Sequence, residues 1–257
     1  MPKVSVNGIN LNYEVHGEGH PIILLPGYGG TLETWRHQVA AFSREFRLIT
    51  CDLRGHGGTD SPASPDEYSA DIVIEDVLQL MKTLGVDKAV MGGHSMGGYL
   101  AMRFYLAHPG HVSALVLIGA GPGFRNPIQK EAWNRRCRDY AEVLEAQGIE
   151  AFVARFPGVL SRNGSGHNPV GLAHAARGVM AQFDSYVTEN LGQIKVPTLI
   201  IDGERDKRNV PASQYMARSI PGAQCAVVPD AGHAASLDNP KDFNKIVLDF
   251  LRSNLQV

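Results

Sequence analysis

The chain has 257 residues, of which 44% are hydrophobic and 19% charged, so it can bury a sizeable core and is not disordered as a whole. Its 24 Lys and Arg residues face 26 Asp and Glu residues, and a net charge of −2 argues against a nucleic-acid-binding protein. Cys51, Cys137 and Cys225 are odd in number and far apart in the sequence, so they give neither a zinc motif nor a disulfide framework. Because no signal peptide or membrane-length apolar run is visible, we expect a cytoplasmic protein. No arrangement of His and Cys suggests a metal site, and we expect no cofactor.

Strands come first in chain order. Apolar residues alternate on both sides of Asn7-Gly8, and this dipeptide suits a type I′ turn, so residues 4–15 are predicted to form a β-hairpin. Short, mainly apolar runs then indicate strands buried on both faces. They lie at residues 21–25, 47–51, 88–92, 114–118, 197–201 and 225–228.

Helical patterns separate these strands. Residues 73–84 repeat apolar side chains with helical spacing and stop at Gly85. Residues 35–46, 97–108 and 243–251 are also predicted to be helical. Alternation of buried strands with helices predicts an α/β fold, a doubly wound and mostly parallel sheet of about eight strands covered on both faces.

The alternation stops between residues 122 and 191. This stretch shows helical segments around 133–144 and 172–186, a loop expected to be flexible at 163–169, and no convincing buried strand. We therefore expect an α/β core formed by residues 1–121 and 192–257, with a helical cap of residues 122–191 inserted after the sixth strand.

A candidate nucleophile lies between a strand and a helix. Gly93-His94-Ser95-Met96-Gly97 is a GxSxG motif, which alone occurs easily by chance. Here a buried strand leads directly into the motif and a helix leads out of it. Such a tight turn needs the flanking glycines and presents the serine hydroxyl at the carboxyl edge of the sheet.

A serine hydroxyl needs a base to take its proton and an acid to orient that base. His233 follows the last buried strand and Asp206 follows the strand before it, so both are expected at the same edge as Ser95. Asp202 and Glu204 are alternative acids, but we favour Asp206 because a residue inside the strand end has less freedom to reach a histidine. The oxyanion that forms on a carbonyl group would be bound by the backbone N–H groups of Tyr28 and Met96.

Together these motifs resemble the α/β-hydrolase family over nearly the whole chain. The resemblance rests on Pro26-Gly-Tyr-Gly-Gly, Asp52-Leu-Arg-Gly-His-Gly-Gly-Thr, Gly93-His-Ser-Met-Gly-Gly, Gly203-Glu-Arg-Asp and Ala231-Gly-His. Small capped esterases, lactonases and carbon–carbon hydrolases are the most similar members. The family often has histidine where this chain has Pro26, and we treat the segment from Asp52 to Thr59 as structural.

The resemblance implies a serine hydrolase that acts on a carboxylic ester or lactone of a small molecule through an acyl-enzyme. Carbon–carbon bond hydrolysis or a related lyase reaction by the same triad is the alternative. It is less favoured because ring-cleavage hydrolases of the family typically carry tryptophan where this chain has Ala234. A ligand-sensing homologue is a further alternative, whereas dehalogenase and epoxide hydrolase chemistry is disfavoured because the elbow residue is serine and not aspartate.

The substrate itself cannot be predicted from the sequence. His94, Phe124 and Trp133 are candidate pocket residues, with packing as the competing interpretation. The only partner expected is the small-molecule substrate, with neither nucleic acid nor membrane, and the oligomeric state is left open.

Overall fold

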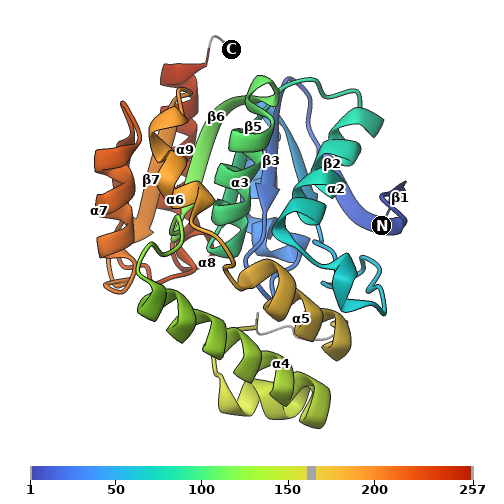
Figure 1. The fold of residues 1–257 in the computed structure, drawn as a ribbon. Coiled ribbons are helices and arrows are strands. Elements are labelled where there is room, and N and C mark those ends of the chain that lie inside the picture. The colour runs from blue at the N-terminus through green and yellow to red at the C-terminus, as the bar shows by residue number, and fades with distance from the viewer. Residues whose placement is uncertain (1, 161–165, 256–257) are drawn as a thin grey trace.

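The computed structural model describes residues 2–160 and 166–255, and its strands form one eight-stranded sheet with the order β1-β2-β4-β3-β5-β6-β7-β8 (Figure 1). β1 pairs with β2 and β2 with β4 in antiparallel fashion, and all other neighbours run parallel. The expected α/β fold with a mostly parallel sheet is therefore confirmed. The strands are β1 (Lys3–Val6), β2 (Ile9–His16), β3 (His20–Leu25), β4 (Phe46–Cys51), β5 (Ala89–His94), β6 (Val112–Ile118), β7 (Thr198–Gly203) and β8 (Gln224–Val228).

The first two strands form the predicted hairpin. Asn7 and Gly8 both have positive φ angles, 41° and 77°, as a type I′ turn requires. The pairing of Val6 with Ile9 closes the turn with two residues between the strands. The dipeptide therefore fixes the register of the hairpin.

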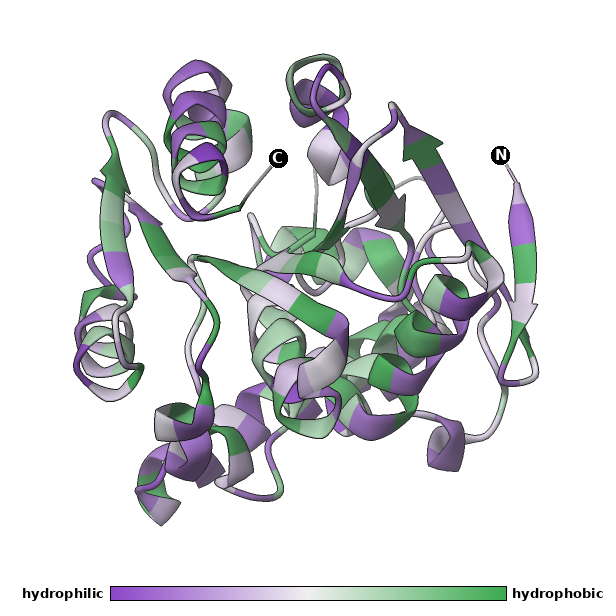
Figure 2. Cartoon of the chain, turned by 90° about the horizontal axis from the view of Figure 1, so that it is seen from above, coloured by the Kyte–Doolittle hydropathy of each residue, from purple (hydrophilic) through white to green (hydrophobic). Residues whose placement is uncertain are grey.

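Helices cover both faces of the sheet because the parallel strands are apolar on both sides. Ile23 and Leu25 of β3 pack in one core with α2 (Ala70–Thr83), α3 (Met96–Ala107) and α7 (Val210–Ser219). Ile22 and Leu24 pack in the other core with α1 (Arg36–Phe42), α8 (Ala235–Asp238) and α9 (Pro240–Asn254). Viewed from above, hydrophobic residues gather on the central strands and on the sides of the helices next to them (Figure 2). Short 3₁₀ helices occur at η1 (Leu32–Trp35), η2 (Pro65–Glu67), η3 (Pro109–His111) and η5 (Leu191–Gln193).

One predicted strand differs from the expectation. The apolar run 225–228 was expected to be buried on both faces, but Cys225 is exposed and Val227 is 59% exposed. β8 lies at the end of the strand order and, among the strands of the described residues, pairs with β7 alone, so its other side is an open edge there. An apolar run alone does not distinguish an edge strand from a central one.

The predicted cap region holds two helical bodies. α4 (Pro127–Arg155) is interrupted at Gly148, and α5 (Pro169–Ala175) continues into a π-helical turn, η4 (Ala176–Met180). Figure 1 shows α4 and α5 beyond one end of the strands, whereas α6 (Tyr186–Asn190) packs against α3. The helix expected over 172–186 ends at Met180, because the backbone of Gln182 exchanges two hydrogen bonds with the Asn134 side chain of α4 and residues 181–185 are not helical. The division into core and cap stays a prediction, and residues 163–165 of the expected loop lie outside the described part.

α5 and η4 contact the core through glycines. A Cβ atom at Gly178 would collide with the carbonyl oxygen of Tyr68, and one at Gly171 would collide with the hydroxyl of Ser61. On the core side, a Cβ atom at Gly55 would lie 2.7 Å from the carbonyl oxygen of Gly171. The backbone of α5 and η4 is therefore in close contact with the core. We call this contact, which involves Gly55, Gly171 and Gly178, the seat of α5.

Within the described residues, no helix combines the length and the apolar character that crossing a membrane requires.

Candidate active site

Ser95 occupies a strained turn between β5 and α3. Its φ and ψ angles are 53° and −114°, an unusual combination for a residue with a side chain. The Ser95 N–H donates to the carbonyl of Ile118 over 2.8 Å, and the Ser95 carbonyl accepts from the N–H of Gly98 over 3.0 Å. A Cβ atom at Gly93 would collide with Gly97, so the glycines of the motif are required by the close approach of the two chain segments.

His233 and Asp206 form a hydrogen-bonded pair. The Nδ1 atom of His233 lies 2.6 Å from Oδ2 of Asp206, whose side chain is 8% exposed. Because an ionised carboxylate only accepts, Nδ1 carries the proton, and Nε2 of a neutral His233 then presents a lone pair. The two alternative acids have other partners, since Asp202 accepts from the Asn209 side chain and Glu204 from the Asp230 N–H.

Ser95 is adjacent to this pair but not hydrogen-bonded to it. The ring of His94, the residue before Ser95, lies 4.7 Å from the ring of His233, centroid to centroid. Among the described residues, none forms a hydrogen bond with the Ser95 hydroxyl. The His233 side chain is 51% exposed, so solvent reaches the imidazole. Catalytic hydrogen bonds are often long without substrate and tighten in the complex. The structure thus contains the hydrogen bond between Asp206 and His233, whereas a hydrogen bond between His233 and Ser95 stays a prediction.

The two N–H groups expected to bind an oxyanion are available. The loop of residues 26–30 follows β3 and packs against the serine turn, where a Cβ atom at Gly27 would lie 3.4 Å from Cβ of Ser95. Met96 is the first residue of α3, so its N–H lies at the positive end of the helix dipole. Neither the Tyr28 nor the Met96 N–H donates to another residue in the described part of the chain. Their use by an oxyanion remains a prediction.

His94 has a defined partner. Its Nε2 donates to the backbone carbonyl of His233 over 2.9 Å, and a Cβ atom at Gly27 would lie 3.0 Å from its Nδ1. Desolvation within this contact, together with the nearby His233, lowers the pKa of His94 to about 3. The imidazole is therefore neutral at physiological pH. Its predicted place in the substrate pocket stays a prediction.

Phe124 and Trp133 lie against each other, with ring centroids 6.0 Å apart. The Trp133 indole N–H donates to the Met180 carbonyl, and the Phe124 backbone N–H donates to the Gln182 side chain. Both residues therefore hold the predicted cap together. Their contribution to a pocket is untested by these contacts and stays a prediction.

A buried carboxylate organises the loops beside the site. Asp52 follows β4 and accepts hydrogen bonds from the Leu32 N–H, the Gly58 N–H and the Asn12 side-chain amide, each over 2.8 Å. The Thr59 hydroxyl donates to the Asp52 carbonyl over 2.7 Å. This network ties the chain after the 26–30 loop to the turn after β4, which fits the structural role expected for residues 52–59.

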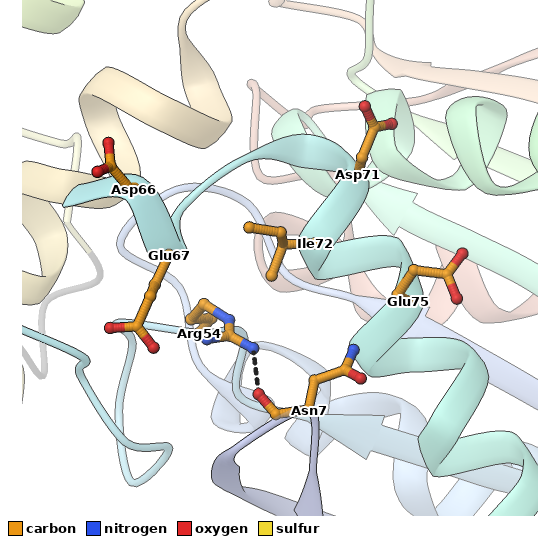
Figure 3. Close-up of a pocket in the computed structure, with 7 residues that line it drawn as sticks. All are labelled: Asn7, Arg54, Asp66, Glu67, Asp71, Ile72 and Glu75. Atoms are coloured by element: carbon orange, nitrogen blue, oxygen red, sulfur yellow. Dashed lines mark hydrogen bonds between the residues drawn. The ribbon is translucent and has the colours of Figure 1, made fainter. Parts of the chain in front are cut away.

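A hollow of about 520 Å³ lies between the β-hairpin and α2, and its lining includes none of the candidate site residues predicted from the sequence. Figure 3 shows its acidic side chains around Arg54, which donates to the Asn7 carbonyl. Arg54 also forms a buried ion pair with Asp76, so its charge is neutralised inside the protein. The hollow is lined by Asn7, Arg54, Asp66, Glu67, Asp71, Ile72 and Glu75. Within the described residues, no three His, Cys, Asp or Glu side chains are arranged to hold a metal ion.

Sequence reasoning missed two features near the site. Gly119, with a φ of 52°, lies beneath His233, and a Cβ atom there would be 3.3 Å from Nδ1 of the imidazole. The Tyr28 side chain is buried, and its hydroxyl donates to the Leu172 carbonyl over 3.0 Å. A glycine directly after a buried strand was the only sequence signal for the first feature. Nothing local indicated the second.

Comparison with known proteins agrees with this architecture. The sequence model of the family described as "alpha/beta hydrolase fold" matches residues 20–240. A Bacillus subtilis protein named as a candidate 2-succinyl-6-hydroxy-2,4-cyclohexadiene-1-carboxylate synthase is 30% identical over 95% of this chain and 96% of its own. A candidate carbamate hydrolase, RutD, from Rhizobium rhizogenes is 31% identical over 96% of this chain and 100% of its own. The enol-lactonase structure from Burkholderia xenovorans LB400 superposes with a TM-score of 0.82 at 29% identity, covering 98% and 100% of the two chains.

Proposed function

The chain belongs to the alpha/beta hydrolase fold family, and within that family we propose that it is a serine hydrolase that cleaves a carboxylic ester or lactone of a small molecule. The observation that carries the proposal is the 2.6 Å hydrogen bond between His233 and Asp206 beside the strained Ser95 turn. An imidazole whose Nδ1 proton is held by a carboxylate has the tautomer that a general base for serine needs.

The reaction would proceed in two halves. In acylation, the Ser95 oxygen attacks the carbonyl carbon while Nε2 of His233 takes the hydroxyl proton, and the Tyr28 and Met96 N–H groups bind the oxyanion. The imidazolium then protonates the leaving alkoxide, and an alcohol departs. In deacylation, His233 takes a proton from water, the hydroxide attacks the acyl-enzyme, and the acid leaves as the proton returns to Ser95. Asp206 holds the imidazole in both halves and stabilises its charged form.

The names of similar proteins support a hydrolytic reaction at a carbonyl group. One similar structure is an enol-lactonase, and one relative is named as a candidate carbamate hydrolase. Lactones, esters and carbamates all form a tetrahedral oxyanion when a nucleophile attacks, so one set of backbone donors serves all three.

The proposal is tested with a chain-length panel of activated esters and lactones. Wild-type protein is expected to turn over at least one member of the panel repeatedly and to be labelled by a phosphonylating probe. Ser95→Ala is expected to lose both activities. The matched control is Ser5→Ala, an exposed serine on β1, which should behave as wild type. Persistent labelling of Ser95→Ala would refute the assignment of the nucleophile.

A second candidate function, a lyase or carbon–carbon bond hydrolase using the same triad, is favoured by the name of the Bacillus subtilis relative. Ala234 follows His233 where ring-cleavage hydrolases of the family carry tryptophan, and this difference favours the ester reaction. Turnover of a vinylogous diketone acid far above that of every ester would reverse the order. Repeated turnover of any ester without a binding protein would argue against a purely ligand-sensing role.

A further inference from the structure

Tyr28 faces two parts of the protein at once. Its backbone belongs to the loop of residues 26–30 that packs on the serine turn, and its side chain is buried among residues of the predicted cap. The phenol hydroxyl donates to the Leu172 carbonyl of α5 over 3.0 Å. The ring stacks on Tyr140 of α4 with centroids 6.1 Å apart and planes 24° apart. One side chain therefore contacts both α4 and α5 of the predicted cap.

The next residue of the loop also meets the cap. Gly29 has a φ of 67°, and a Cβ atom there would lie 3.3 Å from Cα of Leu160 and closer still to its side chain. Leu160 is itself buried in the same core as Tyr28. Two consecutive residues of the loop, Tyr28 and Gly29, are thus in contact with the predicted cap.

The residue that accepts the hydrogen bond from Tyr28 lies on a helix that packs closely on the core. Leu172 belongs to α5, which is seated on the core by the glycine contacts of Gly55, Gly171 and Gly178. Burial raises the pKa of the Tyr28 phenol well above its usual value, so the hydroxyl keeps its proton and remains a donor. The hydrogen bond of the buried hydroxyl therefore links the closely packed α5 to the 26–30 loop.

We propose that Tyr28 is a positioning residue whose side chain transmits the position of α5 to the oxyanion-binding N–H of the same residue. The cap then has a function beyond shaping the pocket, because correct seating of α5 sets the donor that stabilises the transition state. The inference rests on the proposed function, since it assumes that the Tyr28 N–H binds an oxyanion. Oxyanion donors act through precise placement, so a small displacement of the loop lowers kcat and leaves ground-state binding intact.

The test compares three variants of the full chain with wild type. Tyr28→Phe removes the hydroxyl and keeps the ring, and Leu160→Ala removes the cap side chain that contacts Gly29. The matched control is Thr188→Val, because the Thr188 hydroxyl makes a comparable buried bond of 2.7 Å to the Pro122 carbonyl without contacting the 26–30 loop. For each protein, kcat and KM on an activated ester, the phosphonylation rate and amide hydrogen exchange of the 26–30 segment are measured.

Tyr28→Phe and Leu160→Ala are each expected to lower kcat by about tenfold with KM within about twofold, the size expected from a lost hydrogen bond and a displaced donor. Phosphonylation should slow in parallel, and hydrogen exchange in residues 26–30 should accelerate. Thr188→Val should leave all of these values near wild type. An equal loss of kcat in Thr188→Val would overturn the proposal, because general loosening of the cap would then explain the effect.

Hydrogen exchange separates this inference from the function on which it rests. If wild type hydrolyses no ester and takes up no probe, the serine hydrolase proposal fails. The exchange rates then decide the mechanical coupling alone. Unchanged exchange in residues 26–30 of both loop variants would show that the cap does not set the position of the loop, whatever the activity of wild type.

Discussion

The Nε2 atom of His94 donates to the backbone carbonyl of His233 over 2.9 Å, so the residue before the candidate nucleophile holds the loop of the candidate base. A carbonyl accepts and cannot donate, so the proton of a neutral His94 resides on Nε2. The bond spans the gap between the serine turn and the loop after β8. It gives His94 a positioning role whether or not it also lines the pocket.

Replacement of His94 should therefore act on turnover more than on binding. We expect His94→Phe to lower kcat by about fivefold, the value of one hydrogen bond, with KM little changed. His94→Gln retains a donor and should recover part of the loss. Steady-state kinetics on an activated ester measure both effects, and equal activity of the two variants would show that the bond does not matter.

The hydrogen bond from His233 to Asp206 predicts a large loss when the acid becomes an amide. Asp206→Asn can donate to Nδ1 and thus favours the wrong tautomer, so kcat should fall by about 10³- to 10⁴-fold while the fold persists. Glu204→Gln is the matched control, because Glu204 lies in the same turn and accepts from the Asp230 backbone N–H instead of from a histidine. A similar loss in both variants would place the effect in the turn and not in the pair.

Gly119 predicts a loss that combines stability and activity. Gly119→Ala places a methyl group 3.2 to 3.3 Å from His233 at a positive φ of 52°, so it should cost about 1 to 2 kcal/mol of stability and displace the imidazole, lowering kcat. Gly85→Ala is the control, since Gly85 has a φ of 65° with open space around it. Urea unfolding should show a loss in both variants, whereas only Gly119→Ala should be slower in kinetics.

Stability should fall at acidic pH because of a buried histidine. His56 is 1% exposed, and burial, offset partly by a bond to the Arg54 carbonyl, lowers its pKa to about 4. A folded-state pKa below the unfolded value of 6.5 means that the unfolded chain binds the proton first. The stabilisation is complete above pH 6.5 and is lost as the pH falls toward 4, by about 3 kcal/mol.

Urea unfolding at several pH values measures this loss. His56→Asn keeps a donor for the Arg54 carbonyl but has no basic nitrogen. The number of protons that the chain takes up on unfolding over the same pH interval should therefore fall by about one. If the unfolding free energy of His56→Asn changes with pH as steeply as that of wild type, the acid sensitivity belongs to other groups. Among these, His94 has an even lower pKa, about 3.

The sequence predicted most of the features that depend on local pattern and strand order. Buried apolar runs located the strands, and two turns that follow neighbouring parallel strands brought Asp206 to His233. The exposure of Val227 was not predictable, because the same apolar run occurs in central and edge strands. The end of the helix near Met180 depends on reciprocal hydrogen bonds between Gln182 and Asn134, which are distant in sequence.

The direction of the Tyr28 side chain shows a different kind of limit. The Pro26-Gly-Tyr-Gly-Gly motif indicates where a backbone donor lies, and any residue type could supply that N–H. The destination of the phenol depends on where α5 is seated, and that depends on glycine contacts between segments more than a hundred residues apart in the chain. Local pattern carries no information about such a contact.

The glycine contacts beneath α5 limit how the predicted cap can be exchanged for another. Gly171 and Gly178 contact core atoms so closely that no space is left for a methyl group. A transplanted segment therefore keeps the same distance from the core only if it has glycine at both positions. A graft with bulkier residues there would sit farther from the core and carry Leu172 with it. Chimaeras that take their substrate specificity from another protein should therefore retain the native residues 169–180 and replace the other residues of the predicted cap.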